Sequence, residues 1–395
     1  MVIRLIGAAV IGLGVGLVHC HTYEKTKNAK LLAVCDLIDR RLTKAKSVFP
    51  KVDLYKDYAE LLRRDDIDVV SIAVPNFLHA KVALDAIEAG KNVFLEKPMA
   101  LTLEECDEIM EAARKNDVKF TIDFELRFSP VWRDIKKLVD DGKIGRVAST
   151  AIYWWRLPFH GPFKPGKWGE HRKFAGNMFF EEAIHWFDML RWYGGEITHV
   201  HCLTNDWVRK EIKYEQTAFV NFNYRSGAVG QISQTINGFE THGTIWTIGT
   251  KGSVLASITY SPFGNQGVMR YTPHPEDIAD EYRGITRTED EVRYIVKTRH
   301  FGEEVFEVHA MEKHIQRFVD DIVKDREPLV TGEDGRKSVE LCLAAEMSAR
   351  NNEPVGLPLR RSPDFALDRA REGTEDMKEY LKLVKEWPYI KEWPF

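Results

Sequence analysis

The sequence contains little cysteine and has no long apolar run. Its five cysteines are scattered without a CxxC pair, and their odd total fits a reducing compartment better than a disulfide framework. No stretch reaches the roughly 18 consecutive apolar residues with which a helix spans a bilayer. We therefore expect a cytoplasmic protein with no membrane partner, in which the cysteines are packing residues. They are Cys20, Cys35, Cys106, Cys202 and Cys342.

An excess of charge of one sign is also lacking. The chain has 56 Lys and Arg against 60 Asp and Glu, a formal net charge of −4, so nothing in the overall balance indicates a nucleic-acid partner. Hydrophobic residues at 44% and charged residues at 29% are typical of a soluble globular protein. At 395 residues the chain is longer than a typical domain, which predicts two domains.

Histidines with metal-binding spacing are missing too. The segments HCH at 19–21 and HVH at 199–201, and the pair His309 and His314, lack the helical spacing and accompanying carboxylates of a catalytic zinc site. We expect no protein-bound metal.

What the sequence does have is a glycine-rich start, GAAVIGLGVGLVHC at residues 7–20. An apolar run after one arginine could be a secretory signal, but Gly12, Gly14 and Gly16 weaken a helix interior. Strand, glycine turn and helix instead form the context of a dinucleotide-binding loop, whose backbone approaches a pyrophosphate at the helix N-terminus. The GxGxxG spacing counted from Gly12 ends on Leu17, so Gly16 lies one residue early and the loop is shortened.

The hydrophobic pattern changes near residue 124. Residues 1–124 alternate apolar strands with amphipathic helices, which predicts a doubly wound parallel sheet, a Rossmann domain. Residues 125–359 contain hairpin pairs, with turns at RSGA and TKG, which predicts an α/β domain with an open, largely antiparallel sheet. Residues 360–395 form a charged helical tail that either docks on the body or a neighbouring subunit, or packs loosely.

An acidic residue ends the second predicted strand. Asp36 lies 24 residues after Gly12, close to the spacing at which a carboxylate binds the adenosine ribose hydroxyls. It would repel a 2′-phosphate, which favours NAD over NADP, although Arg40 or Arg41 could accommodate that phosphate. The alternative is that Asp36 caps the following helix.

Two further predicted strands end in candidate site residues, the first in Pro75 and Asn76 and the second in Glu96 and Lys97. The carboxyl ends of parallel strands face the ligand crevice. With GLGVG, VCD, the PNxLH segment, AGKNVFLEKP and a later HxxD, the chain resembles the glucose-fructose oxidoreductase and inositol dehydrogenase (Gfo/Idh/MocA) family from about Leu5 to Leu359.

The resemblance implies a nicotinamide-binding Rossmann domain and a second domain that covers the nicotinamide. It also implies a homodimer or homotetramer through the C-terminal sheet. Lys97 matches the family's active-site lysine, whose ammonium would stabilise alkoxide-like charge on the reacting hydroxyl; the alternative is a surface lysine in a turn. The expected cofactor-binding residues are Gly12, Gly14, Val15, Gly16, Asp36, Leu37, Pro75, Asn76, His79, Glu96 and Lys97.

The segment GNMFFEEAIHWFDMLRWYGG at 176–195 supplies the other half of the expected site. Glu181, His185 and Asp188 are spaced i, i+4 and i+7, so a helix would present all three on one stripe. His185 is the natural proton acceptor for a substrate hydroxyl, unless it is simply a packed core histidine. Where the family usually has DxGxH, this chain has Glu181 in place of the Asp and Ala183 in place of the Gly. We count Glu181 among the catalytic candidates.

Substrate contacts are expected from Arg127 and from the Pro- and Gly-rich loop at 154–176. Arg127 could instead form a salt bridge that fixes the two domains. The loop tryptophans either stack on a sugar ring or seal the domain interface, and the basic loop permits an anionic substrate group. The loop candidates are Trp154, Trp155, Arg156, His160, Lys164, Lys167, Trp168, His171 and Arg172. The expected substrate-binding residues are Arg127, Trp155, Arg156, Trp168, Arg172, Glu181 and His185.

These features predict an NAD-dependent oxidoreductase that oxidises a secondary hydroxyl of a sugar, sugar derivative or cyclic polyol. Two alternatives stay open. One is an NAD-retaining oxidoreductive glycoside lyase, hydrolase or epimerase that acts through a transient keto-sugar, and the other is a catalytically inactive nucleotide-binding sensor.

Overall fold

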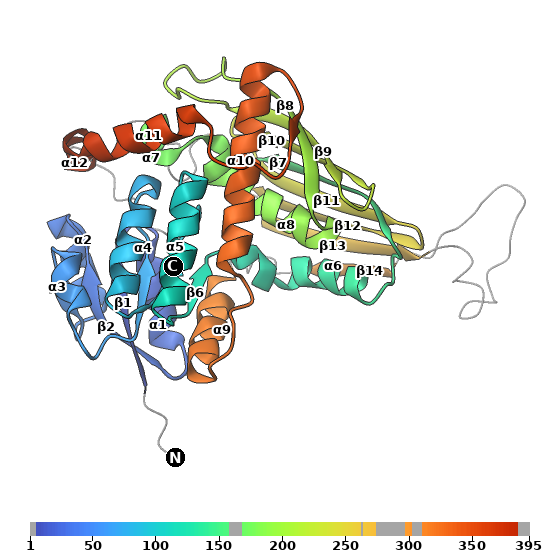
Figure 1. Cartoon of the computed structure of the whole chain (residues 1–395). Coiled ribbons are helices and arrows are strands. Elements are labelled where there is room, and N and C mark those ends of the chain that lie inside the picture. The colour runs from blue at the N-terminus through green and yellow to red at the C-terminus, as the bar shows by residue number, and fades with distance from the viewer. Residues whose placement is uncertain (1–4, 158–167, 262–263, 274–296, 302–309, 386–395) are drawn as a thin grey trace, which may run out of the picture.

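The computed structural model describes residues 5–157, 168–261, 264–273, 297–301 and 310–385. Two sheets with their helices lie side by side, one built mainly from the N-terminal third of the chain and one from the middle (Figure 1). None of the helices in these ranges combines the length and apolarity needed to cross a bilayer. The fold therefore has the two-sheet organisation that the change of hydrophobic pattern predicts.

The first sheet has six parallel strands in the order β3-β2-β1-β4-β5-β6. The order reverses between β1 and β4, the switch point at which doubly wound sheets bind ligands. The predicted Rossmann sheet is confirmed. Its strands are β1 (Ile6–Ile11), β2 (Ala29–Cys35), β3 (Asp53–Tyr55), β4 (Val69–Ile72), β5 (Asn92–Leu95) and β6 (Phe120–Ile122).

Helices cover both faces of this sheet. The capping box of Thr102 and Glu105 begins α5, because each side chain accepts a hydrogen bond from the backbone N–H of the other residue. The helical segments are α1 (Gly16–Lys25), α2 (Asp39–Val48), α3 (Tyr58–Leu62), η1 (Asn76–Leu78), α4 (His79–Glu88) and α5 (Leu103–Lys115).

One helix on this sheet comes from much later in the chain. Ile315, Phe318 and Val319 of α9 (Met311–Val323) belong to the same buried cluster as Val10 of β1 and Phe94 of β5. Residues 310–323 therefore complete the core of the Rossmann sheet, although they follow the whole second sheet in sequence.

The second sheet has nine strands in the described part of the chain, in the order β14-β13-β12-β11-β7-β10-β9-β8-β15. Only β7 and β10 pair in parallel, so the prediction of a largely antiparallel sheet is confirmed, as are both hairpins. The strands are β7 (Val147–Trp155), β8 (Ile197–Asn205), β9 (Thr217–Tyr224), β10 (Val229–Thr235), β11 (Thr241–Gly249), β12 (Gly252–Ser261), β13 (Gly264–Pro273), β14 (Lys297–Phe301) and β15 (Val355–Gly356).

One face of this sheet packs against α8 and α10, and no helix of the described residues covers the opposite face, which we call the open face (Figure 1). Along β9 the residues alternate, with Val220 and Phe222 buried and Phe219 exposed. The remaining helical segments are η2 (Glu125–Phe128), α6 (Pro130–Asp140), η4 (Trp168–Glu170), α7 (Arg172–Ala175), the π-helical turn η5 (Phe179–Ala183), α8 (Ile184–Gly194), α10 (Gly332–Asn351), α11 (Asp364–Glu375) and α12 (Met377–Lys385).

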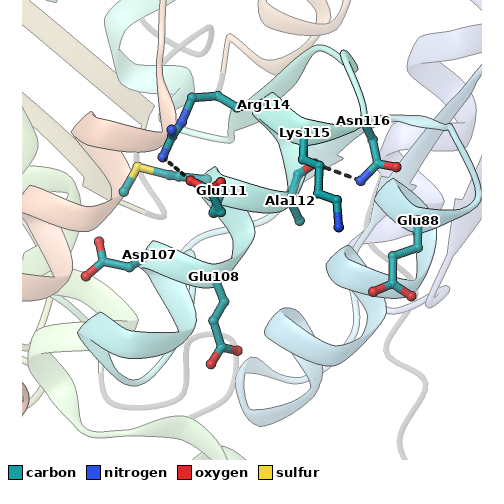
Figure 2. A pocket seen from close by; sticks show the side chains of 9 residues that line it. Glu88, Asp107, Glu108, Glu111, Ala112, Arg114, Lys115 and Asn116 are labelled. Atoms are coloured by element: carbon teal, nitrogen blue, oxygen red, sulfur yellow. Dashed lines mark hydrogen bonds and ion pairs between the residues drawn. The ribbon is translucent and has the colours of Figure 1, made fainter.

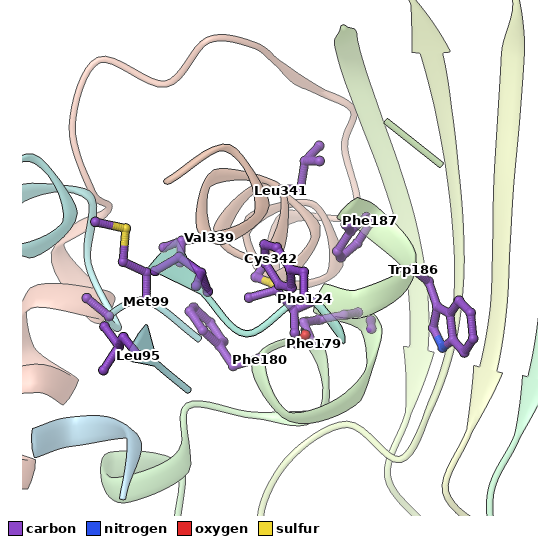
Figure 3. Packing of buried hydrophobic residues seen from close by; sticks show 14 of the residues in the cluster. Leu95, Met99, Phe124, Phe179, Phe180, Trp186, Phe187, Val339, Leu341 and Cys342 are labelled. Atoms are coloured by element: carbon purple, nitrogen blue, oxygen red, sulfur yellow. Dashed lines mark hydrogen bonds between the residues drawn. The ribbon is translucent and has the colours of Figure 1, made fainter. Parts of the chain in front are cut away.

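A shared apolar core joins the two sheets. Figure 3 shows Phe124, Phe179 and Phe180 packed between Met99, which follows β5, and Cys342 of α10. These residues flank the strand ends that carry the predicted site, so that region has a tightly packed support.

The described part of the C-terminal tail docks on the body. Arg369 of α11 donates to Glu346 of α10 at 2.7 Å, and both side chains are buried. Tyr380 of α12 is 6% exposed. Of the alternatives left open for the tail, docking on the body holds for 364–385, and residues 386–395 lie outside the described residues.

Candidate active site

The glycine loop follows β1 and opens α1, as a dinucleotide site requires. Gly12 has φ +90°, and a Cβ there would lie 2.4 Å from the Ala73 oxygen. A Cβ on Gly16 would lie 2.9 Å from Cγ1 of Val10, whereas one on Gly14 would meet nothing within 4 Å. Gly12 thus permits the turn, Gly16 permits close helix–strand packing despite its early position, and Gly14 faces open space.

Asp36 lies against this loop. Its Oδ2 accepts a hydrogen bond from the Leu13 N–H at 2.8 Å, and its Oδ1 accepts from the Ile38 N–H at 2.8 Å. Arg41 donates to Oδ2 at 3.1 Å. Ile38 is the N-cap residue of α2, so this contact lies ahead of the first helical turn and does not cap it, and the bond to Leu13 places the carboxylate beside the glycine loop. Leu37 next to it is exposed.

Three predicted residues converge where the two domains meet. The Asn76 amide donates to Oε1 of Glu181 at 2.5 Å and to the Ala175 carbonyl oxygen at 2.8 Å. The Lys97 ammonium donates to the main-chain oxygen of Glu181 at 2.5 Å. Asn76 and Lys97 follow β4 and β5, so the carboxyl ends of two central strands meet the segment that leads into α8.

The Glu181 carboxyl is buried, and its pKa is raised to about 7. Loss of hydration is the main cause, while the charge of Lys97 and the hydrogen bond from Asn76 act in the opposite direction. The carboxyl therefore changes its protonation state near neutral pH, as a general acid or base must.

His185 follows Glu181 by four residues, across the junction between the turn 179–183 and α8. Its Nδ1 lies 3.9 Å from Oε2 of Glu125, and its ring meets the Phe124 ring edge-on at 6.3 Å between centroids. The expected single stripe with Asp188 is interrupted, because 179–183 form a π-helical turn before α8 begins at Ile184. Extra residues in a turn rotate the side chains that follow.

Asp188 instead pairs with Arg127. The Arg127 guanidinium donates to both Asp188 oxygens, at 2.7 and 2.5 Å, and to both oxygens of Asp334, at 3.2 and 3.0 Å. The Arg127 side chain is 4% exposed. These contacts correspond to the salt-bridge alternative for Arg127, linking the exit from the Rossmann sheet to α8 and α10.

The loop candidates separate into two groups. Trp155 lies on the open face of the sheet, because neighbouring strand residues point to opposite sides, and it approaches His242 there. Trp154 points to the other face, packs on Trp186 and donates weakly to Glu182 at 3.4 Å. The strand thus directs Trp154, not Trp155, toward α8, and the expected substrate contact of Trp155 stays a prediction.

The arginines of this region have carboxylate partners. Arg156 lies 3.5 Å from Glu182, and Arg172 pairs with Glu346 at 2.7 Å and Glu215 at 3.2 Å. Trp168 packs against the main core, and His171 meets the Phe174 ring. His160, Lys164 and Lys167 lie outside the described residues.

His79 is enclosed by main-chain carbonyls. Its Nδ1 lies 2.5 Å from the Pro98 oxygen and its Nε2 lies 2.8 Å from the Val74 oxygen. Burial is the main influence on this ring and lowers its pKa. Burial favours the neutral ring, which donates from only one nitrogen, so His79 bonds one of these two carbonyls and lies between the loops after β4 and β5. Its expected contact with a cofactor stays a prediction.

A buried polar cluster under Lys97 was missed by the sequence analysis. His19 lies 3.1 Å from Glu96, and His314 lies 3.0 Å from Asp123. Burial, with the charges of Glu125 and Glu96, raises the pKa of Asp123. Donor atoms of His19, Glu96 and Asp123 lie within 4.8 Å of one another, a spacing that could hold a metal ion. Sequence spacing carried no signal of it, because four different elements contribute.

A surface depression on the outer side of α4 and α5 is separate from this site (Figure 2). Since these helices run antiparallel to the strands, its residues near their C-terminal ends lie toward the opposite edge of the sheet from Lys97. Its lining is charged, with an ion pair of Glu111 and Arg114 at 2.8 Å. It contains none of the predicted site residues.

Comparison with protein families matches both parts of the chain. Residues 6–124 match the NAD-binding Rossmann fold of the Gfo/Idh/MocA oxidoreductases, and residues 136–357 match their C-terminal α/β domain. The chain belongs to the Gfo/Idh/MocA oxidoreductase family. The resemblance inferred from GLGVG and EKP is thereby confirmed, and so is the assignment to nicotinamide-dependent dehydrogenases.

Several relatives align over nearly the whole chain. The scyllo-inositol 2-dehydrogenase (NAD(+)) of Bacillus subtilis is 28% identical over 90% of this chain and 97% of its own, and the myo-inositol 2-dehydrogenase of Thermotoga maritima is 27% identical over 88% and 97%. Levoglucosan dehydrogenase in complex with NADH and levoglucosan has the same fold, with a TM-score of 0.78 at 21% identity over 90% of this chain and 100% of that one.

Proposed function

We propose that this protein is an NAD-dependent dehydrogenase that oxidises a secondary hydroxyl of a sugar, sugar derivative or cyclic polyol. The observation that carries the proposal is the convergence of Lys97 and Asn76 with Glu181 at the carboxyl ends of parallel strands. The inositol dehydrogenases among its relatives, and a fold neighbour bound to levoglucosan, agree with hydroxylated ring substrates.

The residues of the glycine loop fit a dinucleotide. Backbone N–H groups near Gly14, Val15 and Gly16 would hold the diphosphate, Asp36 and Leu37 would lie at the adenosine ribose, and Pro75, Asn76, Glu96 and Lys97 would lie at the nicotinamide end. When bound, NAD supplies the hydride acceptor. NAD is favoured over NADP because Asp36 repels a 2′-phosphate and Arg41 is already paired with Asp36.

The chain's own groups handle the proton. The Lys97 ammonium would donate a hydrogen bond to the substrate hydroxyl oxygen and stabilise the negative charge that develops there. The imidazole of His185 would accept the hydroxyl proton, and Glu181, with its pKa near 7, would exchange a proton with Lys97 or with the substrate.

A neutral substrate suits the described part of the site. Arg156 and Arg172 each lie beside a carboxylate, so neither presents an uncompensated positive charge to an anionic group. Such paired polar groups instead match the hydroxyls of an uncharged ring. Within the family, this favours sugars and polyols over acidic sugars.

The open face of the second sheet supports a homo-oligomer. Large apolar side chains are exposed on five of the six strands from β12 to β8, more than isolated surface residues would explain. A second copy of the chain would cover them, as a homodimer or homotetramer. They are Leu203, Phe219, Val229, Trp246, Ile248 and Leu255.

One observation supports a second candidate, an oxidoreductive lyase, hydrolase or epimerase that regenerates its cofactor. Once a ring hydroxyl is oxidised, the neighbouring C–H becomes acidic, and Glu181 is a buried base with a pKa suited to remove that proton. Such an enzyme converts its substrate without net accumulation of NADH.

The test starts from the purified full-length protein, with nucleotide released on denaturation identified by mass. Inositols, neutral sugars, glycosides and uronic acids are then offered with NAD or NADP while absorbance of reduced nicotinamide and product formation are both followed. We expect NADH with a neutral polyol or sugar. Product without NADH would favour the second candidate, and Lys97→Ala that retains full turnover on every substrate would refute both.

A further inference from the structure

Three aromatic rings from distant parts of the chain form one cluster beside the site. Phe77 lies in η1, Phe174 in α7 and Tyr380 in the C-terminal helix α12. The ring centroids are 5.1 Å apart for Phe77 and Phe174, 5.3 Å for Phe77 and Tyr380, and 5.8 Å for Phe174 and Tyr380. These separations are favourable for aromatic pairs, so the Tyr380 ring contacts both domains at once.

The two other rings adjoin the hydrogen bonds of the site. Phe77 directly follows Asn76, whose amide bridges Glu181 and the Ala175 carbonyl oxygen, and Phe174 directly precedes Ala175. Pressing Phe77 and Phe174 together therefore presses Asn76 against the segment that carries Glu181. Without the third ring, this contact would depend on one aromatic pair.

The helices that deliver Tyr380 are anchored to α7 just ahead of it in the chain. The Lys173 ammonium pairs with Asp376 at 2.8 Å and with Glu379 at 2.5 Å. A Cβ on Gly373 would lie 2.4 Å from the Lys173 oxygen, so only glycine lets α11 approach α7 this closely.

The C-terminal helices also reach the cofactor side. Figure 1 shows α11 and α12 lying across the edge of the Rossmann domain at which the strands end. Burial raises the pKa of Tyr380, while the charge of Arg41 lowers it and that of Asp36 raises it. Tyr380 is thus close enough to Arg41 and Asp36 for their charges to act on its hydroxyl.

We propose that Tyr380 is a positioning residue, whose ring holds the Asn76 amide against Glu181 across the domain boundary. The significance for catalysis rests on the proposed function, because it takes Glu181 as a site residue. The C-terminal helices accordingly complete the active site from outside both of its domains.

The test reads the protonation of Glu181 directly, without substrate. Infrared difference spectra of the full-length protein, titrated from pH 5 to 9, follow its carboxyl stretch, and Glu181→Gln assigns the band. The other titratable groups facing this carboxyl are Lys97, Glu96, Glu182 and Tyr214 in the described residues, and they are unchanged in every variant.

We expect Asn76→Ala to raise the proton affinity of Glu181 about tenfold, because a hydrogen bond to the ionised form is lost. Tyr380→Ala should raise it by a similar factor and add nothing in the Asn76→Ala background, since it acts through the same bond. Tyr380→Phe, which keeps the ring, should titrate like the parent, as should Lys378→Ala on the exposed side of α12.

A wild-type midpoint in Tyr380→Ala would overturn the proposal, and so would an effect that adds fully to that of Asn76→Ala. If Tyr380→Ala does not fold, Tyr380→Leu keeps apolar volume without the aromatic ring and is held to the same two outcomes. Because no turnover is measured, failure to find a sugar or polyol substrate leaves this result readable.

Discussion

Replacing Arg127 tests whether it is a buried ion-pair residue or a substrate contact. In Arg127→Leu the Asp188 carboxyl, 1% exposed, loses a guanidinium that binds both of its oxygens. Asp334 keeps its ion pair with Arg191, so the main cost falls on Asp188. Removing one partner of a buried pair costs about 3–5 kcal/mol, and we expect the free energy of unfolding to fall by that amount at pH 8.

The destabilisation should depend on pH in a defined direction. Burial already raises the pKa of Asp188 while Arg127 lowers it, so the variant's carboxyl becomes a still weaker acid in the folded state. A carboxyl with a raised folded pKa contributes stability at low pH that is lost as the pH rises toward that pKa. Arg127→Leu should therefore be least destabilised near pH 5.

Urea unfolding followed by tryptophan fluorescence and circular dichroism measures the effect. The double variant Arg127→Leu with Asp188→Leu removes both charges and should be more stable than Arg127→Leu alone. An Arg127→Leu protein that unfolds like the parent, yet shows a raised KM for the substrate, would refute the ion-pair role and restore the substrate contact.

Three further outcomes are expected. Parent protein should lose about 2.5 kcal/mol of unfolding free energy between pH 5 and 8 that Glu181→Gln does not lose, because the folded pKa is raised from 4.5 to about 7. Equal pH dependence in urea titrations of the two proteins would contradict the buried acid. Gly14→Ala should keep the parent's melting temperature but bind NAD at least about tenfold more weakly by calorimetry. Gly12→Ala should lower the melting temperature itself, because its Cβ would lie 2.4 Å from the Ala73 oxygen. The reverse pattern would disprove the loop assignment. The five buried cysteines, whose pKa values are all raised chiefly by burial, should react with Ellman's reagent only after unfolding, and prompt labelling of the native protein would show otherwise.

Local patterns predicted much of the architecture. The strand, glycine turn and helix at Gly12 to Gly16, and the hairpin at RSGA, are written in residues that lie close together in the sequence. Their backbone preferences and apolar periodicity act over a few residues, and that range is what a sequence pattern reports. For the same reason, the sequence predicted that Lys97 follows a parallel strand, at the edge of the sheet where ligands bind.

Partner choice among side chains could not be predicted in this way. The sequence offered two roles for Arg127, and the fold brought Asp188 and Asp334 to its two edges. An i, i+4, i+7 stripe was expected from Glu181, and a π-helical turn changed which of its members share a direction. These outcomes depend on small rotations and on which elements pack together, neither of which is encoded in spacing.

The sequence by itself therefore determined the two-sheet organisation, the dinucleotide loop and the identity of Lys97, Glu181 and His185 as candidates. Only the tertiary structure decided that α9 returns to the Rossmann sheet, that Glu96 and Asp123 share a buried cluster, and that Tyr380 reaches the site. Local elements form from neighbouring residues, whereas these contacts join segments up to about 300 positions apart. Such segments come together because folding buries apolar surface, and burial is non-directional, so the sequence pattern of one segment does not specify which other segment it packs against.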